Sequence, residues 1–248
     1  MFELIDVSYS YNAAPALQSI SLTIEKGESV SFLGANGCGK STLLKLMNGL
    51  IVPDAGTYRF DGNAIDRKTL SDVAFSKGLH QRVGFVFQNS DTQLFCADVF
   101  DEIAFGPRQM GLSQHEVETR VSETLALLGL CGFEGRHPYH LSGGEKRKVA
   151  LAAVLAMNPD ALILDEPMNG LDPRTMHWLA DFLVRINSAG KTIILSTHNL
   201  ELVQEISERV VLFTENHSIA ADLPSSHLLN DIDLLKRINL VDQNFCGR

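Results

Sequence analysis

The first sixty residues show the two-residue alternation of apolar and polar positions that is typical of β-strands. One such run extends from Phe2 to Tyr11, with a slip near Ile5, and a more regular run covers Ile20–Ile24. Turn residues at 53–56 and 61–63 bracket a third short run. The sequence therefore predicts three strands in this region.

The next residues, 64–80, are polar and only weakly periodic, and we interpret them as a surface connection. From about Gln88 to Met157 the apolar spacing becomes helical. Ser113 and Glu116 fit the capping box that opens a helix, and apolar residues then share one helix face up to Gly129. This stretch predicts a helical insert between two strands of the core.

Strands and helices alternate from Ala161 onward. Ala161–Leu164 is almost entirely apolar, as expected for a strand covered on both faces of a sheet. Asp172 followed by proline predicts the start of a helix, and Gly190 its end. The remaining elements that this alternation predicts are strands at Thr192–Leu195 and Arg209–Phe213 and helices at Leu200–Ile206 and 223–240.

Composition narrows the functional classes. Hydrophobic residues make up 45% of the 248, but the longest apolar run, Val149–Met157, is far shorter than the ~20 residues that span a bilayer. The first residues lack a basic region followed by an apolar one, so we expect no signal peptide. A net charge of −9 argues against nucleic acid as the main partner. The four cysteines show no C-x-x-C pairing, so we expect reduced thiols in a cytosolic protein.

The most specific motif is Gly34–Thr42, which matches G-x-x-x-x-G-K-[ST], a loop that binds nucleotide phosphates. A buried strand is predicted before it, at Ser29–Leu33, and a helix after it, with its N-terminus facing the phosphates. We expect Lys40 to reach the β- and γ-phosphates and the Ser41 hydroxyl to ligate Mg²⁺. The alternative is a chance glycine-rich turn. The expected nucleotide-binding residues of this loop are Asn36, Gly37, Cys38, Gly39, Lys40, Ser41 and Thr42.

Two acidic residues, Asp165 and Glu166, follow the apolar strand at 161–164. In sheets of this kind the carboxyl ends of parallel strands lie beside the phosphate loop. We therefore expect Asp165 to hold Mg²⁺ through water and Glu166 to polarise a water that attacks the γ-phosphate. The alternative is a strand that simply ends in solvent.

A second informative string is Leu-Ser-Gly-Gly-Glu at 141–145. Ser142 and Glu145 fit a capping box, which needs neither of the two glycines between them. Gly143 and Gly144 would expose N–H groups at the positive end of a helix, where an anion binds favourably. A helix cap and a phosphate contact are compatible interpretations of this string.

Together, Lys40, residues 141–145, Asp165-Glu166 and Ser196–His198 resemble the ATP-binding cassette (ABC) ATPases in order and spacing, over about residues 2–215. The resemblance implies an α/β fold: a P-loop NTPase core with a mostly parallel sheet, an N-terminal antiparallel β subdomain and a helical insert. It also implies one domain over 1–248, with a core at 1–87 and 159–222, a helical subdomain at 88–158 and a C-terminal appendage at 223–248.

The same resemblance implies roles for single residues. Tyr11 matches the aromatic residue that stacks on adenine, and His198 matches the histidine that contacts the γ-phosphate. Gln88 matches the loop glutamine that senses Mg²⁺ and the partner, and residues 169–172 match the loop that crosses between subunits. Taken singly, these three side chains also have structural interpretations: a strand-end aromatic, a strand cap and a loop histidine.

One position departs from the family pattern. In the family, the signature sequence that matches residues 141–145 usually ends in glutamine, whereas this chain has Glu145. A carboxylate that points toward a triphosphate is unfavourable. It is harmless if it bonds back to the Ser142 backbone, as a capping box requires, so we expect retained activity.

A finer resemblance, to the ATPases of energy-coupling-factor importers for cobalt, nickel or vitamins, lies at 86–95 and 99–107. That pattern usually has proline where Ser90 stands and Asp-Val where Glu102-Ile103 stand. The alternatives are another ABC importer or exporter and a soluble non-transport ABC ATPase. A small-molecule kinase would not need residues 141–145.

The resemblance further implies ATP and Mg²⁺ as cofactors, with Ser41, Gln88 and Asp165 as the metal-binding residues. It implies a transmembrane permease and a second ATPase subunit, in a homodimer or a heterodimer, as partners. Two ATP molecules would lie between the subunits, and Ser142, Gly143, Gly144 and Glu145 would serve the ATP of the opposite chain. The protein would then be peripheral, at the cytoplasmic face of the cell membrane.

Overall fold

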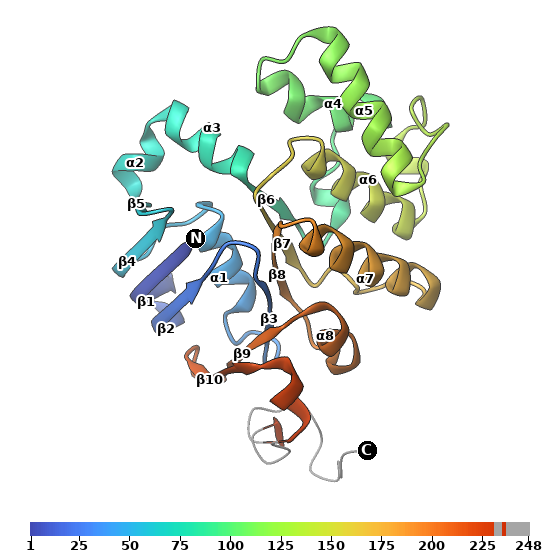
Figure 1. Ribbon diagram of the computed structural model, residues 1–248. Coiled ribbons are helices and arrows are strands. Elements are labelled where there is room, and N and C mark those ends of the chain that lie inside the picture. Colours follow the sequence, from blue (N-terminus) through green and yellow to red (C-terminus); the bar gives the residue numbers. More distant parts are fainter. Residues whose placement is uncertain (231–234, 237–248) are drawn as a thin grey trace.

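The computed structural model describes residues 1–230 and 235–236, and within them the strands form two sheets (Figure 1). The first sheet is antiparallel, in the order β2-β1-β4-β5, and the second has the order β10-β9-β3-β8-β7-β6. In the second sheet only the β10–β9 pair is antiparallel. The strands are β1 (Phe2–Tyr11), β2 (Ala14–Ile24), β3 (Ser29–Leu33), β4 (Ala55–Phe60), β5 (Asn63–Ala64), β6 (Val83–Val86), β7 (Ala161–Asp165), β8 (Thr192–Ser196), β9 (Arg209–Phe213) and β10 (Ile219–Pro224).

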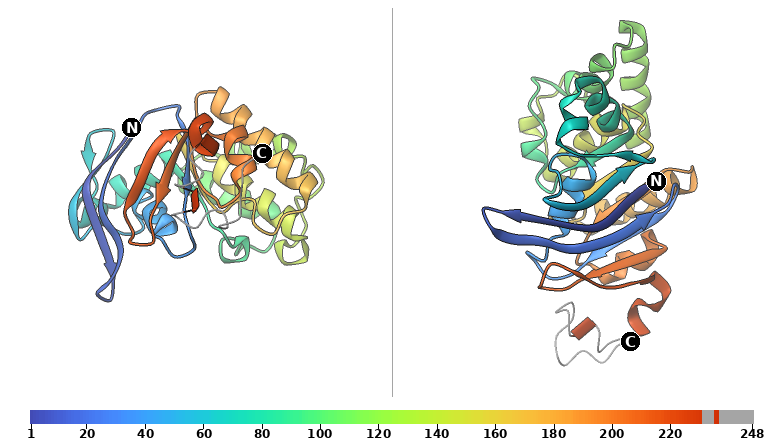
Figure 2. Two further views of the ribbon diagram at one scale, coloured as in Figure 1. Left: turned by 90° about the horizontal axis from the view of Figure 1, so that it is seen from below. Right: turned by 90° about the vertical axis from the view of Figure 1, so that its left-hand side faces the viewer.

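Burial explains the difference between the two sheets. Every residue of β3, β7 and β8 is buried, because helices or strands cover both faces of the parallel sheet. β2 instead alternates between buried and exposed positions over its last residues. Helix α1 (Lys40–Met47) packs in one apolar cluster with residues of both sheets, and α7 (Pro173–Ser188) packs on the other face of the parallel sheet. Figure 2 shows the blue strands β1 and β2 as an outer layer and the green and yellow helices on the opposite side.

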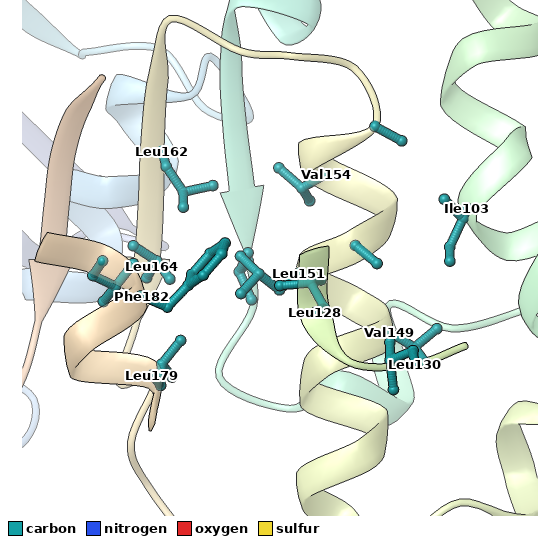
Figure 3. Packing of buried hydrophobic residues seen from close by; sticks show 14 of the residues in the cluster. Ile103, Leu128, Leu130, Val149, Leu151, Val154, Leu162, Leu164, Leu179 and Phe182 are labelled. Carbon is teal, nitrogen blue, oxygen red and sulfur yellow. The ribbon is translucent and has the colours of Figure 1, made fainter. Parts of the chain in front are cut away.

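A helical unit is inserted between β6 and β7. It contains α4 (Val99–Gln109), α5 (Gln114–Leu128) and α6 (Gly143–Leu155). Ser113 opens α5 with both bonds of the predicted capping box, and Gly129 ends that helix in a left-handed conformation. Leu151 and Val154 of α6 lie in one packed layer with residues of β7 and α7 (Figure 3). This layer fixes the insert against the core by burying apolar side chains, each stabilising the fold by about 1.5–3 kcal/mol.

Residues 64–80 are largely exposed, as predicted for a surface connection, but they contain two helices that the sequence did not predict, α2 (Arg67–Ser71) and α3 (Val73–Arg82). Their apolar residues are too few to give a clear period. Aspartate caps define them instead: Asp66 accepts a hydrogen bond from the Thr69 N–H, and Asp72 accepts from the N–H groups of Ala74 and Phe75. Polar composition here marks exposed helices and not a loop.

The predicted α/β class, the mostly parallel sheet, the N-terminal antiparallel sheet and the helical insert are confirmed. The sequence did not predict β10, and the helix expected at 223–240 is replaced at its start by the end of β10 and a 3₁₀ turn at Ser225–Asn230. Of the rest of that predicted helix, only residues 235–236 are described, and Leu235 is buried against Val203 and Leu212. The division of the chain into core, helical subdomain and appendage stays a prediction.

The remaining elements are short. They are α8 (Leu200–Ile206) and the 3₁₀ turns Ser90–Thr92 and Pro138–His140. Among the described residues, none of the helices combines the length and the apolar composition that crossing a bilayer requires.

Candidate nucleotide site

Four neighbouring strands end at the same edge of the parallel sheet, and each leads into a predicted site segment. β3 leads into the loop at 34–39, β6 into Gln88, β7 into Glu166 and β8 into His198. The strands are in register, with Val86 beside Leu164 and Asp165 beside Ser196. The carboxyl edge therefore brings together segments that are far apart in the sequence.

The loop before α1 requires glycine at its last position. Gly39 has a φ of 111°, and a Cβ atom there would lie 2.4 Å from the carbonyl oxygen of Ala16. Gly39 is also the N-cap of α1 and has no side chain to accept the first helical N–H groups. These N–H groups are thus available to an anion, and the loop backbone can approach it closely.

Lys40 is 6% exposed, and its ammonium group donates to two carbonyl oxygens and, at 3.8 Å, to the Sγ atom of Cys38. Its Nζ donates to the oxygens of Gly34 at 2.7 Å and Ala35 at 3.1 Å. Among the described residues, no carboxylate lies within 4 Å of it. A buried cation without a carboxylate is costly, and a phosphate at this loop would compensate its charge. The residues present therefore fit a nucleotide.

Other residues of the loop differ in exposure. Asn36 and Gly37 lie exposed at its tip, and Ser41 and Thr42 are half-buried at the start of α1. Cys38 is buried, and this burial raises the pKa of its thiol, although the nearby Lys40 charge opposes the shift. Cys38 is therefore a neutral thiol that fills space beneath the loop.

Asp165 links three of the four strand ends. Its Oδ1 accepts hydrogen bonds from the hydroxyl of Ser41 at 2.8 Å and from the hydroxyl of Ser196 at 2.7 Å. The Ser196 oxygen in turn accepts a bond from the N–H of Glu166 at 2.9 Å. Carboxylate and hydroxyl oxygens are ligands that Mg²⁺ prefers, so Ser41 and Asp165 fit the predicted metal site.

Glu166 sits in a conformation that is uncommon for its residue type. Its φ is 45°, in the left-handed region, and only 7% of the residue is exposed. Its Oε2 lies 3.0 Å from Nδ1 of His198, and the imidazole is largely exposed. Such backbone strain persists where the surroundings demand it and is frequent at active sites. Glu166, the predicted base, and His198, the predicted contact of the γ-phosphate, are therefore adjacent.

Tyr11 and Gln88 occupy the margins of the site. Tyr11 is exposed at the end of β1 and meets the ring of Tyr9 edge-on, with centroids 4.9 Å apart. It pairs with Ala14, two residues from the Ala16 carbonyl that lies against Gly39. The Gln88 side chain is exposed and hydrogen-bonds to no other described residue. Their predicted roles stay predictions.

The structure does not bring Ser142 to the phosphate loop of its own chain. Ser142 is the N-cap of α6, and its side chain takes part in the predicted capping box. One oxygen of Glu145, Oε2, accepts from the Ser142 N–H at 2.8 Å and from the Ser142 hydroxyl at 2.7 Å. These bonds, with weaker help from the Arg136 charge, hold the pKa of Glu145 below its usual value. Glu145 therefore points back toward the cap, as expected.

Two residues near the site had no individual role predicted from the sequence, although Ser196 belongs to the matched segment Ser196–His198. Ser196 bridges Asp165 and Glu166, although its hydroxyl at a strand end resembles many others in the chain. Arg147 is buried in α6 and binds the carbonyl oxygens of Phe87 and Gln88. The sequence does not single out Arg147, because it stands between Lys146 and Lys148 in a run of three basic residues.

Comparison with known proteins gives a consistent result. A family model described as ABC transporter matches residues 17–169. The nickel import ATP-binding protein LarO of Lactiplantibacillus plantarum is 45% identical, over 92% of this chain and 95% of that protein. The energy-coupling factor transporter ATP-binding protein EcfA of Methanothermobacter thermautotrophicus is 42% identical, over 97% of this chain and 76% of that protein.

Solved structures resemble the whole fold. CbiO1 from Clostridium perfringens, described as part of the ABC transporter complex CbiONQ, superimposes with a TM-score of 0.82 at 33% identity. That match covers 96% of this chain and 94% of CbiO1. A dimeric, post-hydrolysis structure of the ATP-binding cassette MJ0796 with ADP and Pi has a TM-score of 0.81 at 27% identity, over 91% of this chain and 99% of that one.

Proposed function

The chain belongs to the ABC transporter family, and we propose that it powers a membrane importer of the energy-coupling-factor type, for cobalt or nickel ions or a vitamin. As an ATP-hydrolysing subunit of a transporter it needs a membrane permease, which holds the transported substrate. The likeness to LarO, EcfA and CbiO1 over nearly the whole chain supports the importer assignment. The structural observation that supports this assignment is a groove formed in part by residues 86–95 and 99–107, the segments that resemble importer ATPases.

This groove, of about 770 Å³, lies between α3, the segment after β6, α4 and α6. Phe95 and Phe105 line it and are 68% and 45% exposed, with ring centroids 5.0 Å apart. Beneath them, the buried Glu102 carboxylate accepts the N–H groups of Phe95 and Cys96 at 2.9 and 2.8 Å and so fixes this segment. Exposed, fixed aromatic rings in an apolar groove are suited to an amphipathic helix, which we assign to the permease.

The nucleotide site fits the hydrolytic half of this function. The loop N–H groups and Lys40 would bind the phosphates of ATP, Tyr11 would stack on adenine, and Ser41, Asp165 and Gln88 would hold Mg²⁺. The metal would neutralise phosphate charge.

Glu166 would accept a proton from the attacking water. His198, beside it, would contact the γ-phosphate and orient the Glu166 carboxylate. As water adds to the γ-phosphorus, the bond to the ADP oxygen breaks. The residues named in this mechanism are our proposal.

Dimerisation completes the site. Ser142 lies away from the phosphate loop of its own chain. The N-terminal end of α6, which Ser142 caps, could therefore bind the ATP of a second chain if two chains enclose the nucleotides between them. The dimeric MJ0796 structure supports this arrangement. ATP would hold the two chains together, and loss of the γ-phosphate would let them separate and move the permease.

We expect the charge of Glu145 to weaken the proposed contact between α6 and the ATP of the opposite chain. The Glu145 carboxylate accepts a hydrogen bond from the Ser142 hydroxyl and places a negative charge in the first turn of α6, where the opposing phosphate would bind. Glu145→Gln keeps the capping box but removes the charge. We expect ATP-driven dimerisation, measured by analytical ultracentrifugation in a hydrolysis-deficient background, to strengthen roughly two- to fivefold, the effect of one charge at a helix end.

The control is Glu116→Gln, which makes the same change in the capping box of α5. It should leave dimerisation unchanged. Equal effects of the two substitutions, or weaker dimerisation of the Glu145→Gln protein, would mean that the Glu145 charge does not face the opposing nucleotide.

The groove is tested by replacing Phe95 and Phe105 together with alanine. Because neither ring contacts the phosphate loop, ATPase activity of the isolated chain should stay within about threefold. Recovery of the permease from detergent-solubilised membranes of the source organism should fall at least about tenfold, since a few apolar anchors dominate such interfaces. Mass spectrometry of the proteins captured with a tagged chain, and metal or vitamin uptake by the cells, provide the measurements.

Leu127→Ala is the matched control, because Leu127 is an equally exposed apolar residue of α5 outside the groove. Full recovery of a polytopic membrane protein with the double phenylalanine variant would contradict the docking site. Capture of no membrane protein by the unmodified chain would instead favour a soluble ABC ATPase, and capture of a permease that exports would overturn the importer assignment.

A further inference from the structure

Arg147 of α6 is a buried cation that the hydrolytic mechanism above does not use. The residue is 6% exposed, and burial lowers the pKa of its guanidinium. Arginine nonetheless stays protonated in proteins, so a full charge is buried here. Among the described residues, no carboxylate lies within 4 Å of it. The negative charge of Asp165 opposes this lowering of the pKa.

The partners of Arg147 are two consecutive backbone carbonyls. Nη1 donates to the oxygen of Phe87 at 2.6 Å, and Nη2 donates to the oxygen of Gln88 at 2.5 Å. The planar guanidinium thus bridges both peptide units through two different nitrogens, whose relative position is fixed, whereas the single nitrogen of a lysine sits on a flexible stem. Burying a charge that has no carboxylate partner costs stability. A role for the Arg147 contact in function would explain why the chain keeps it.

Two further contacts tie the same loop to α6. The Gln93 side chain accepts the N–H of Phe87 at 3.1 Å and donates to the carbonyl of Ala150 at 3.4 Å. Nearer the surface, Lys146 donates to Asp91 at 2.6 Å. The segment from Phe87 to Gln93 is therefore fixed to the helix of the insert at three points. Of these three contacts, only that of Arg147 is made to Gln88, the residue predicted to sense Mg²⁺.

We propose that Arg147 is a positioning residue, which couples the groove to the nucleotide site by setting where the loop presents the Gln88 side chain. This inference rests on the role proposed for Gln88. Arg147 would act through its bonds to the carbonyls of Phe87 and Gln88.

The geometry gives this coupling a physical route. Phe87 and Gln93 line the groove from the loop side, and Val154 lines it from α6. The same helix begins after its N-cap Ser142, about three turns before it reaches the groove. A helix seated in the groove would press on both the loop and α6, and the two can move only as one unit while Arg147 holds them together. A helix bound in the groove would thus move Gln88 together with the N-terminal end of α6 at Ser142.

A double-substitution cycle on the isolated chain tests the proposal. The Arg147→Met substitution removes the bridge while keeping an apolar side chain of similar length. We expect turnover at saturating Mg²⁺ and ATP to fall at least about tenfold, because small displacements of positioning groups carry large rate penalties. In a Gln88→Ala background the same substitution should lower turnover less than about twofold, since the group it positions is gone. ATP binding in EDTA, which depends on Lys40 and its loop, should be unchanged.

Two variants separate positioning from stability. Lys148→Met removes the next cation of α6, which packs over the Trp178 ring, and should leave turnover unaltered. Arg147→Lys keeps the charge but lacks the planar pair of donor nitrogens that fixes the two carbonyls, so its turnover should lie between those of the Arg147→Met and unmodified proteins. If the Arg147→Met protein does not fold, Arg147→Lys carries the same cycle.

Equal, multiplicative losses in the presence and absence of Gln88 would overturn the proposal, as would full activity of the Arg147→Met protein. Wild-type turnover of the Gln88→Ala protein alone would remove the role proposed for Gln88 and, with it, that of Arg147. Because the cycle is read on the isolated chain, failure of the importer assignment leaves these outcomes unchanged.

Discussion

Replacing Glu166 by glutamine is expected to reduce ATP turnover at least about a hundredfold while ATP binding persists. The substitution keeps the size and hydrogen-bonding capacity of the side chain but removes its basicity. Glu166 is positioned for proton transfer by the bond of its N–H to Ser196 and by His198, 3.0 Å from its carboxylate. Steady-state phosphate release measures turnover, and fluorescence of a labelled ATP measures binding.

A second readout follows from the dimer. If Glu166 acts after the dimer has formed, the Glu166→Gln protein should accumulate as an ATP-bound dimer on a sizing column, whereas the unmodified protein should dissociate as it hydrolyses. Glu118→Gln, an exposed substitution on α5, is the control for loss of one acidic side chain. Near-normal turnover with unaltered pH dependence would show that another group activates the water.

Local geometry could be predicted from the sequence where one short segment determines its own conformation. The loop at 34–42 needs glycines at fixed positions, and Gly39 against the Ala16 carbonyl shows why. The capping box of Ser142 and Glu145 is likewise local, so its two bonds could be expected from the spacing of the residues. Asp165 could be placed because an apolar strand must end where the sheet edge opens to the site.

What the sequence did not give depends on contacts between distant segments. Arg147 and the carbonyls of Phe87 and Gln88 are about sixty residues apart, and a backbone acceptor has no residue type that a pattern can reveal. Gln93 lines the groove, but its side chain bonds to the backbone of Phe87 and Ala150, so Phe95 and Phe105 are the better anchors for a docked helix. Helices α2 and α3 were missed because capping, not apolar periodicity, defines them.

The largest loss of function is expected from Ser142→Arg, because it blocks the site between two chains. The arginine would place a bulky cation at the N-terminus of α6, where the opposing γ-phosphate is proposed to bind. Each chain should still bind ATP through Lys40 and its loop, which lie away from Ser142. Dimerisation and hydrolysis should both be lost, as measured by ultracentrifugation and phosphate release. Ser113→Arg is the matched control, since it disrupts the same kind of capping box in α5, with equivalent bonds to Glu116.

Mixing then tests whether the site is shared. A Lys40→Ala chain cannot bind ATP at its own loop but keeps Ser142, so a heterodimer with a Ser142→Arg chain contains one complete site and one doubly defective site. In an equal mixture about half of the dimers are heterodimers, which limits recovered turnover to about a quarter of the unmodified value. Recovery near that level, from two proteins that are inactive alone, requires residues of two chains at one nucleotide. Loss of ATP binding by the Ser142→Arg chain alone would instead place Ser142 in the site of its own chain and contradict the shared arrangement.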